Sequence, residues 1–465
     1  MTTPSLAPPV RIGKAAVGAL GMLAAATGVL EAVVSPTLPL LQRELSISRA
    51  EGALLSIAML ITGAIFAPIA GNLGDRHGGK WVITRLMTVV VAGGLVSAVA
   101  PNLPVMLLGQ VLQGAMVGAM PLSFILVRKY LPPGESGVAI GVVSGLFLGG
   151  GMLGTLIAGP IAEGLSRHWM FAIPTFAIIV ATLFVHRLMP NDPPARTGAK
   201  MDWPGLVLLS GILLTLMFVL AMVPDAGGQP LVFGAVVVFL AALVAGWVSV
   251  ERRSPTPMVD LRMLAKPAIW SSYAITFAVC LGTSSSMFLV PQLFEVPAEA
   301  YGFGASATDI GRYLLPGAVA AAISGPLSGV LARRFGASAV VATGIGFLAA
   351  TLVAMAFIHT EVWHLVIGKV LVALASGICV TAMVVKTATS VDHGETGTAT
   401  SLVLVIRVIA YAAGAQLGGA FLTAATPAGS NIPAESAFIT VFVIAGVVTA
   451  LSLLAVRTLS KGVKE

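Results

Sequence analysis

Residues 71–80 read Gly71-Asn72-Leu73-Gly74-Asp75-Arg76-His77-Gly78-Gly79-Lys80, a charged, glycine-rich stretch between two long apolar runs. Charged side chains are costly in hydrocarbon, and glycine permits tight backbone turns, so the stretch predicts a hairpin loop between two membrane spans. A weaker copy, Gly329-Val330-Leu331-Ala332-Arg333-Arg334-Phe335-Gly336, again lies between apolar runs. The chain is therefore expected to consist of two related halves.

The first stretch resembles a motif of the major facilitator superfamily, Gly-x-Leu-x-Asp-Arg-x-Gly-x-Lys, which lies between the second and third helices of its members. The resemblance implies two six-helix bundles that rock around a central cavity. It also implies a conformational gate that includes Gly71, Asp75, Arg76 and Gly78. By the symmetry of the halves, we expect Asp75 to face the N-terminus of the thirteenth span, because a helix N-terminus attracts negative charge.

The composition is that of an integral membrane protein. Hydrophobic residues make up 57% of the chain, charged residues 10%, and the mean hydropathy is +0.98. The net charge of +7 comes from bases spread over short loops, which is typical of membrane topology and argues against nucleic acid as a partner. The six histidines lack helical metal spacing, and Cys280 and Cys379 lie in apolar runs. We expect no metal, cofactor or disulfide.

Runs of roughly 20 apolar residues predict an all-α protein with fourteen transmembrane helices. They lie near 15–41, 53–71, 81–100, 104–127, 136–162, 169–189, 203–223, 230–250, 268–291, 311–332, 337–358, 362–385, 397–424 and 436–457.

The distribution of Lys and Arg predicts that both termini are cytoplasmic and that the protein resides in the cell membrane. With that orientation nearly all bases outside the spans fall on the cytoplasmic side. The exceptions are Arg43, Arg49, Arg167 and Arg312. The first span is expected to be an uncleaved helix, because its apolar run is longer than that of a signal peptide.

Three segments are expected in the chain. A Pro-rich, charged linker over 190–200 ends a six-helix bundle of residues 1–190. Residues 191–265 hold the linker and an inserted hairpin of two plain apolar spans, and residues 266–465 form the second six-helix bundle. This arrangement matches the internal repeats of transporter folds.

Glu31 is the carboxylate placed most clearly within a span. Gly21, Ala24, Gly28 and Ser35 recur with it at helical spacing, which predicts that it faces protein or water. The surrounding stretch resembles the first-span signature of the fourteen-span drug:proton antiporters, which implies that Glu31 couples proton movement to transport. Arg407 is the second candidate for proton coupling; a structural carboxylate paired with a base is the alternative for Glu31.

Gln110 and Gln113 lie in the fourth span, within a stretch that resembles the Arg-x-x-Gln-Gly motif of that family. Gln110 stands where the family has Arg, which puts proton coupling in question. We expect both amides to line the substrate cavity, with hydrogen bonding between helices as an equal alternative.

The fifth span is dense in glycine and resembles the Gly-Pro motif of exporters. We expect it to form a tight interface and gate between the two bundles, with helix packing alone as the alternative. The residues concerned are Gly149, Gly150, Gly154, Gly159 and Pro160.

Three polar residues of the second half, Lys369, Tyr411 and Glu295, are further candidates for the substrate cavity. Intramembrane charge is expensive and marks functional sites by default. Lys369 and Arg407 are each expected to pair with Glu31 or with an anionic substrate; packing is the alternative.

These features predict a transporter and not an enzyme, and the absence of a phosphate-binding Gly-Lys-Ser loop argues against an ATP-driven pump. The leading hypothesis is a monomeric, proton-coupled exporter of amphipathic drugs or secondary metabolites, whose partners are that small molecule, protons and the bilayer. Two rivals are an exporter of one metabolite without protons and a membrane sensor that transports nothing.

Overall fold

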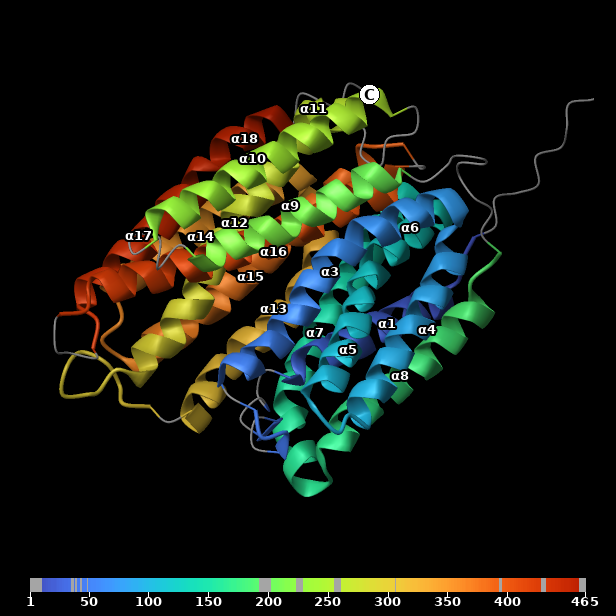
Figure 1. The fold of residues 1–465 in the computed structure, drawn as a ribbon. Coiled ribbons are helices and arrows are strands. Elements are labelled where there is room, and N and C mark those ends of the chain that lie inside the picture. Colours follow the sequence, from blue (N-terminus) through green and yellow to red (C-terminus); the bar gives the residue numbers. More distant parts are fainter. Residues whose placement is uncertain are drawn as a thin grey trace, which may run out of the picture.

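The computed structural model describes residues 11–34, 37, 40–41, 44–47, 49–191, 202–222, 229–254, 261–305, 307–392, 395–427 and 432–459. Most of the predicted linker over 190–200 lies outside these residues. Long helices joined by short connections make up the described chain (Figure 1).

The N-terminal half consists of helices that end close to the predicted spans. They are α1 (Lys14–Ala32), α3 (Arg49–His77), α4 (Gly79–Ala98), α5 (Leu103–Gln113), a short 3₁₀ segment (Gly114–Gly118), α6 (Ala119–Tyr130), α7 (Pro133–Gly164) and α8 (Arg167–Leu188). The 3₁₀ segment joins α5 to α6 where Gly114 passes close to Gly63 of α3. A Cβ at Gly114 would lie 2.6 Å from Thr62 Cβ and 3.0 Å from the backbone nitrogen of Gly63, so a side chain there would prevent that approach.

The C-terminal half follows a helical hairpin. The hairpin is α9 (Trp203–Met222) and α10 (Pro230–Arg253); then come α11 (Leu261–Ala265), α12 (Pro267–Glu295), α13 (Ala307–Phe335), α14 (Ala337–Phe357), α15 (Val362–Thr389), α16 (Thr396–Ala424), α17 (Glu435–Leu451) and α18 (Leu453–Leu459). Twelve helices of the described chain are long and apolar enough to cross a membrane.

Each half has its own apolar core. Buried side chains of α1 and α3–α8, such as Leu20, Phe124 and Phe171, form most of one cluster, which also includes four residues of α15 and α16. Side chains of α12–α17, such as Phe294 and Phe442, form another. Figure 1 shows the two groups side by side, blue to teal and yellow to red. Helices meet across the boundary between them mainly as α7 with α13 and α3 with α16, and also as α6 with α16 and α7 with α15.

The hairpin packs on the outside of this boundary. Leu213 of α9 contacts a cluster formed by Ala64 and Ala67 of α3 and Val405 of α16, so α9 touches both halves (Figure 1). The apolar stretch of α10 is not buried inside the protein, which leaves its Leu, Val and Phe side chains for lipid.

The turn after α3 is tighter than the sequence predicts. Helix α3 continues through Asp75 and Arg76 to His77, and Gly78 alone separates it from α4. Gly78 has φ +92°, a backbone conformation that residues other than glycine rarely adopt. Gly336, with φ +82°, makes the equivalent turn between α13 and α14. The two copies of the motif therefore share a backbone geometry.

Candidate functional site

A cavity of about 460 Å³ lies between the two halves. That volume is within the range of pockets for drug-sized ligands. From the N-terminal half it is lined by Met120, Phe124, Ser144, Leu148, Gly151, Met152 and Thr155; from the C-terminal half by Thr283, Met287, Leu314, Gly317, Ala318, Ala321, Lys369, Val372, Ala373, Ser376, Gly377, Val380, Thr381, Val384, Leu404, Arg407 and Tyr411.

The lining combines a large apolar surface with a few polar groups. Met120, Met152 and Met287 are flexible and polarizable, so they adapt to apolar ligands of different shape. Thr155, Thr283 and Ser376 offer hydroxyl groups for hydrogen bonds. Such a surface suits an amphipathic molecule that binds mainly by its apolar body.

The helices that carry the polar groups are held by close packing. Ser284 of α12 donates a hydrogen bond of 2.5 Å to the carbonyl oxygen of Tyr411 on α16. A Cβ at Gly414 would lie 2.6 Å from the carbonyl oxygen of Leu281, so α12 and α16 approach closely there. Ser284 thus packs helices, whereas the neighbouring Thr283 lines the cavity.

Lys369, Arg407 and Tyr411 all line the cavity, as the sequence predicts for Lys369 and Tyr411. Glu31 of α1 is not among the lining residues, yet the charge of Arg407 acts on its carboxylate. No ion pair within 4 Å joins these two side chains in the part of the chain that the structure describes.

The assignment of Gln110 and Gln113 to the cavity is wrong in this structure. Both amides are fully buried and face α4. Gln113 donates to Ser97 Oγ at 2.6 Å and to the carbonyl oxygen of Gly93 at 3.3 Å, and Gln110 lies 3.5 Å from the same Ser97 Oγ. The alternative of hydrogen bonding between helices is the correct one.

Glu295 is also outside the cavity, because it is the exposed last residue of α12. The sequence signal that suggested it, a polar end after Pro291, reflects the end of the helix at the protein surface.

The expected glycine interface on α7 is only partly correct. Gly150 and Gly154 pack against the backbone of Ala25 and Val29 of α1, within the same half, and Pro160 is exposed. Gly149 faces Ala322 of α13. For Gly159, the expected packing lies outside what the structure describes.

The closest approach between the halves on this side involves other glycines. A Cβ at Gly141 would lie 2.5 Å from the carbonyl oxygen of Gly325 on α13, and one at Gly145 would lie 2.5 Å from Cδ of Pro326. The long glycine stripe of α7 therefore serves two neighbours on different faces, α1 and α13.

At one end of the bundle, which we call the Asp75 end, the two halves are joined by hydrogen bonds. Asp75 is buried, and its carboxylate accepts from the backbone N–H of Gly397 at 3.0 Å and of Thr398 at 2.9 Å. These are the first turn of α16, so the acid meets a helix N-terminus as the sequence predicts. Gly71 touches the backbone of Gly397, which leaves no room for a side chain.

Arg128 completes this contact, and sequence reasoning missed it. It lies in the last turn of α6 and donates to the carbonyl oxygen of Val391 at 2.5 Å and to Thr396 Oγ1. The charges of Asp392 and Asp75 also act on it. Arg76, the residue after Asp75, is also buried. Glu135 forms an ion pair with Arg11 at the surface. A base at the end of a span is usually explained by the positive-inside rule, so the sequence does not reveal that Arg128 also joins the two halves.

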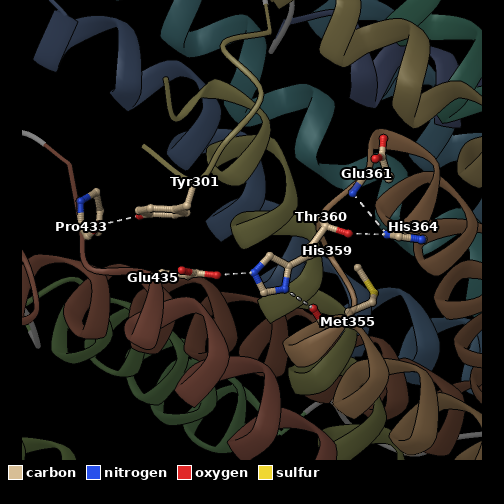
Figure 2. A network of polar contacts seen from close by, with 8 residues as sticks. All are labelled: Tyr301, Met355, His359, Thr360, Glu361, His364, Pro433 and Glu435. Atoms are coloured by element: carbon tan, nitrogen blue, oxygen red, sulfur yellow. Dashed lines mark hydrogen bonds and ion pairs between the residues drawn. The ribbon is translucent and has the colours of Figure 1, made fainter. Parts of the chain in front are cut away.

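The opposite end carries a polar network within the C-terminal half (Figure 2). His359 is buried after α14; its Nε2 lies 3.0 Å from Glu435 Oε1 and its Nδ1 lies 3.1 Å from the carbonyl oxygen of Met355. Tyr301 donates to the carbonyl oxygen of Pro433. Burial and, secondly, the Glu435 carboxylate raise the pKa of Tyr301, which keeps this phenol protonated as a donor. The network ties three connections between helices together.

Replacing His359 by Ala is expected to destabilise this end by about 1–3 kcal/mol, because it removes a buried group that bridges two partners. The measurement is the thermal unfolding midpoint of the purified protein. His186→Ala, an exposed histidine in the last turn of α8, is the matched control and should leave the midpoint unchanged. An equal midpoint for both variants would contradict a structural role of the network.

Comparison with known proteins identifies the class. The sequence model of the Major Facilitator Superfamily matches residues 20–259 and 272–464. The chain is 27% identical over 369 residues to the tetracenomycin C resistance and export protein of Streptomyces glaucescens, covering 75% of this chain and 66% of that protein. It is 26% identical over 353 residues to the uridine/deoxyuridine transporter of Lactococcus lactis subsp. cremoris, covering 74% and 73%.

Other matches agree on the fold. A multidrug resistance protein B homolog of Mycobacterium tuberculosis is 26% identical over 315 residues, and the match spans 65% of this chain but little more than half, 56%, of that relative. The crystal structure of the human organic anion transporter MFSD10 superimposes with a TM-score of 0.71 at 15% identity, covering 95% of this chain and 99% of that one. At this identity the likeness concerns the fold alone.

Proposed function

The chain belongs to the major facilitator superfamily of transporters, and from that premise we propose that it is a proton-coupled exporter of amphipathic small molecules. The observation that carries the proposal is the cavity of about 460 Å³ between the two halves, apolar over most of its surface and bearing Lys369 and Arg407. Two of the relatives are named as resistance proteins, which supports export of drugs or secondary metabolites.

The two halves, 1–190 and 266–465, act as rigid bundles that rock about the cavity. Residues 191–265 contain the inserted hairpin. In this arrangement α3 and α9 cross the bilayer together with the twelve helices that are long and apolar enough by themselves, which gives the fourteen spans of a drug:proton antiporter. The protein works as a monomer in the cell membrane.

The Asp75 end is cytoplasmic, with both termini on that side. Bases gather there, including Arg11, Lys80 and Arg128, whereas Arg167 and Arg312 lie at the opposite end. This asymmetry follows the positive-inside rule. The contact of Asp75 with Gly397 and Thr398 then closes the cavity toward the cytoplasm, and its release opens the inward-facing state.

Glu31 carries the coupled proton, and Arg407 transmits its charge state to the cavity. A buried carboxylate beside a base can change its proton occupancy when the cavity is wetted from one side or the other. Substrate release and proton uptake are then linked through one pair of side chains.

A second candidate is export of a specific metabolite without protons. Gln110 favours it, because a neutral amide bonded to Ser97 stands where the antiporters carry Arg. The relative named as a nucleoside transporter adds a precedent for a specific substrate.

Flux in proteoliposomes separates the candidates. The protein is reconstituted, a fluorescent amphiphile is loaded, and its transport is followed with and without a pH gradient. Proton-coupled export predicts flux that depends on the gradient, and the second candidate predicts flux that does not. Absence of flux for a panel of charged and neutral amphiphiles would refute both and favour a sensor.

Replacing Asp75 by Asn should weaken the cytoplasmic closure, because the neutral amide loses the attraction to the N-terminus of α16. A loss of about 1–2 kcal/mol shifts the ratio of closed to open states about 5–30-fold. The readout is the labelling rate, from the cytoplasmic side, of Thr381→Cys in the cavity lining, with Cys280 and Cys379 replaced by Ala.

Asp309→Asn is the matched control, since it removes the same charge at the start of α13, at the opposite end. It should not change labelling from the cytoplasmic side. Equal labelling rates for wild type and Asp75→Asn would show that the Asp75 contact does not hold the closed state.

A further inference from the structure

The charge of the cavity is unbalanced. Lys369 and Arg407 are the two charged residues that line it, and no Asp or Glu is found among the described lining residues. Arg407 has Glu31 within reach of its charge. For Lys369, no ion pair with an Asp or Glu is found in the part of the chain that the structure describes.

Lys369 is held deep between helices. Its side chain is 91% buried, since its exposed fraction is 9%, and the backbone of α15 at this position packs 3.4 Å from a Cβ placed on Gly317 of α13. In the described part of the chain no hydrogen bond or ion pair engages its Nζ. A buried ammonium group without a partner is costly, so its retention at the cavity wall calls for an anion that binds there.

We propose that the transported molecule is an amphipathic organic anion, whose carboxylate or similar acidic group pairs with Lys369 while its apolar body fills the Met- and Phe-lined part of the cavity. The inference rests on the proposed transport function and names its substrate class. In this arrangement Lys369 supplies the positive charge that selects the anion.

The neighbouring groups support this assignment. Ser376 lies on the same helix as Lys369, about two helical turns away, and lines the same cavity, so a drug-sized ligand paired with the ammonium group can also reach this hydroxyl. Met120 and Phe124 come from the other half and form apolar wall. A charge-assisted hydrogen bond in such a low-dielectric site is stronger than one in water.

The test compares three probes that share a dansyl fluorophore and a short alkyl chain and differ only in their end group: a carboxylate, a methyl amide or a trimethylammonium. Binding to the purified full chain in lipid nanodiscs is followed by dansyl fluorescence. We expect the carboxylate to bind at least tenfold more tightly than the other two. This preference is measured on the wild type, so it does not depend on the folding of any variant.

Lys369→Met keeps the length of the side chain and removes the charge. It should weaken carboxylate binding about tenfold and change amide binding less than twofold, and Lys369→Arg should restore the preference. Lys386→Met is the matched control, because it removes a base from the same helix outside the cavity lining and should change nothing. Equal affinities of the three probes for wild type, or an equal loss for all three in Lys369→Met, would overturn the proposal.

Two further arms make the outcome specific. Nanodiscs of phosphatidylglycerol and of phosphatidylcholine distinguish a lipid anion, which would compete with the carboxylate probe, from a soluble anion, which would not. Carboxylate binding without any flux in proteoliposomes would uphold the anion site and refute the transport function. Flux of the amide or ammonium probe, with no preference for the carboxylate, would uphold the transport function and refute the anion site.

Discussion

Replacing Glu31 by Gln is expected to abolish the part of export that a pH gradient drives, reducing it at least tenfold to the level seen without a gradient. Gln has the shape of Glu but does not bind and release a proton near neutral pH. Glu31 lies in α1 and its carboxylate is the acid on which the Arg407 charge acts. In Glu31→Gln, Arg407 no longer has a neighbouring side chain whose charge changes when it binds or releases a proton.

The measurement is export from proteoliposomes after a pH jump, together with substrate exchange at equal pH on both sides. Exchange should persist in Glu31→Gln, because it does not require net proton movement. Glu295→Gln removes an exposed carboxylate at the end of α12 and serves as the control with full activity. Gradient-driven export at the wild-type rate in Glu31→Gln would remove Glu31 from the coupling mechanism.

Replacing Gly141 by Leu is expected to abolish transport altogether. A Cβ at this position would lie 2.5 Å from the carbonyl oxygen of Gly325, a distance that atoms cannot adopt, so α7 and α13 must separate. A backbone approaches this closely only where the residue that faces it is glycine. The packing between the two halves would be lost, and the cavity between them would change shape.

Transport and the elution profile of the purified protein should be measured for the same set of variants. Gly134→Leu is the control, because Gly134 lies in the first turn of the same helix with nothing within 4 Å of its Cβ position. Gly149→Ala should be tolerated, since its nearest neighbour is Ala322 Cβ at 3.3 Å. Normal transport by Gly141→Leu with an intact elution profile would mean that α7 and α13 do not need this contact.

Sequence alone predicted the positions of the helices and the place of Asp75. Long apolar runs specify membrane helices because every backbone group in lipid must be bonded within its own helix. The repeated glycine-rich motif predicted the equivalent turns at Gly78 and Gly336, which the φ angles confirm. Asp75 could be placed against α16 from the symmetry of the halves, because a buried carboxylate requires donors and a helix N-terminus supplies them.

Sequence could not decide which neighbour each face of a helix meets. Gln110 and Gln113 are polar side chains within a span, as expected of a cavity lining, yet their helix is rotated so that both amides face α4. Similarly, Gly150 and Gly141 belong to one stripe of α7 but contact α1 and α13. Helical periodicity gives the angle between residues and not the absolute rotation of the helix, which side-chain packing fixes.

The sequence by itself therefore determined the membrane class, the two related halves and the intramembrane charges Glu31, Lys369 and Arg407. Only the tertiary structure decided which of these charges line the cavity. It placed Lys369 and Arg407 on the wall of one cavity, left Glu31 outside that lining, and joined the two halves through Arg128. The physical reason is that such contacts link residues hundreds of positions apart, so they depend on how whole helices pack and not on any local pattern.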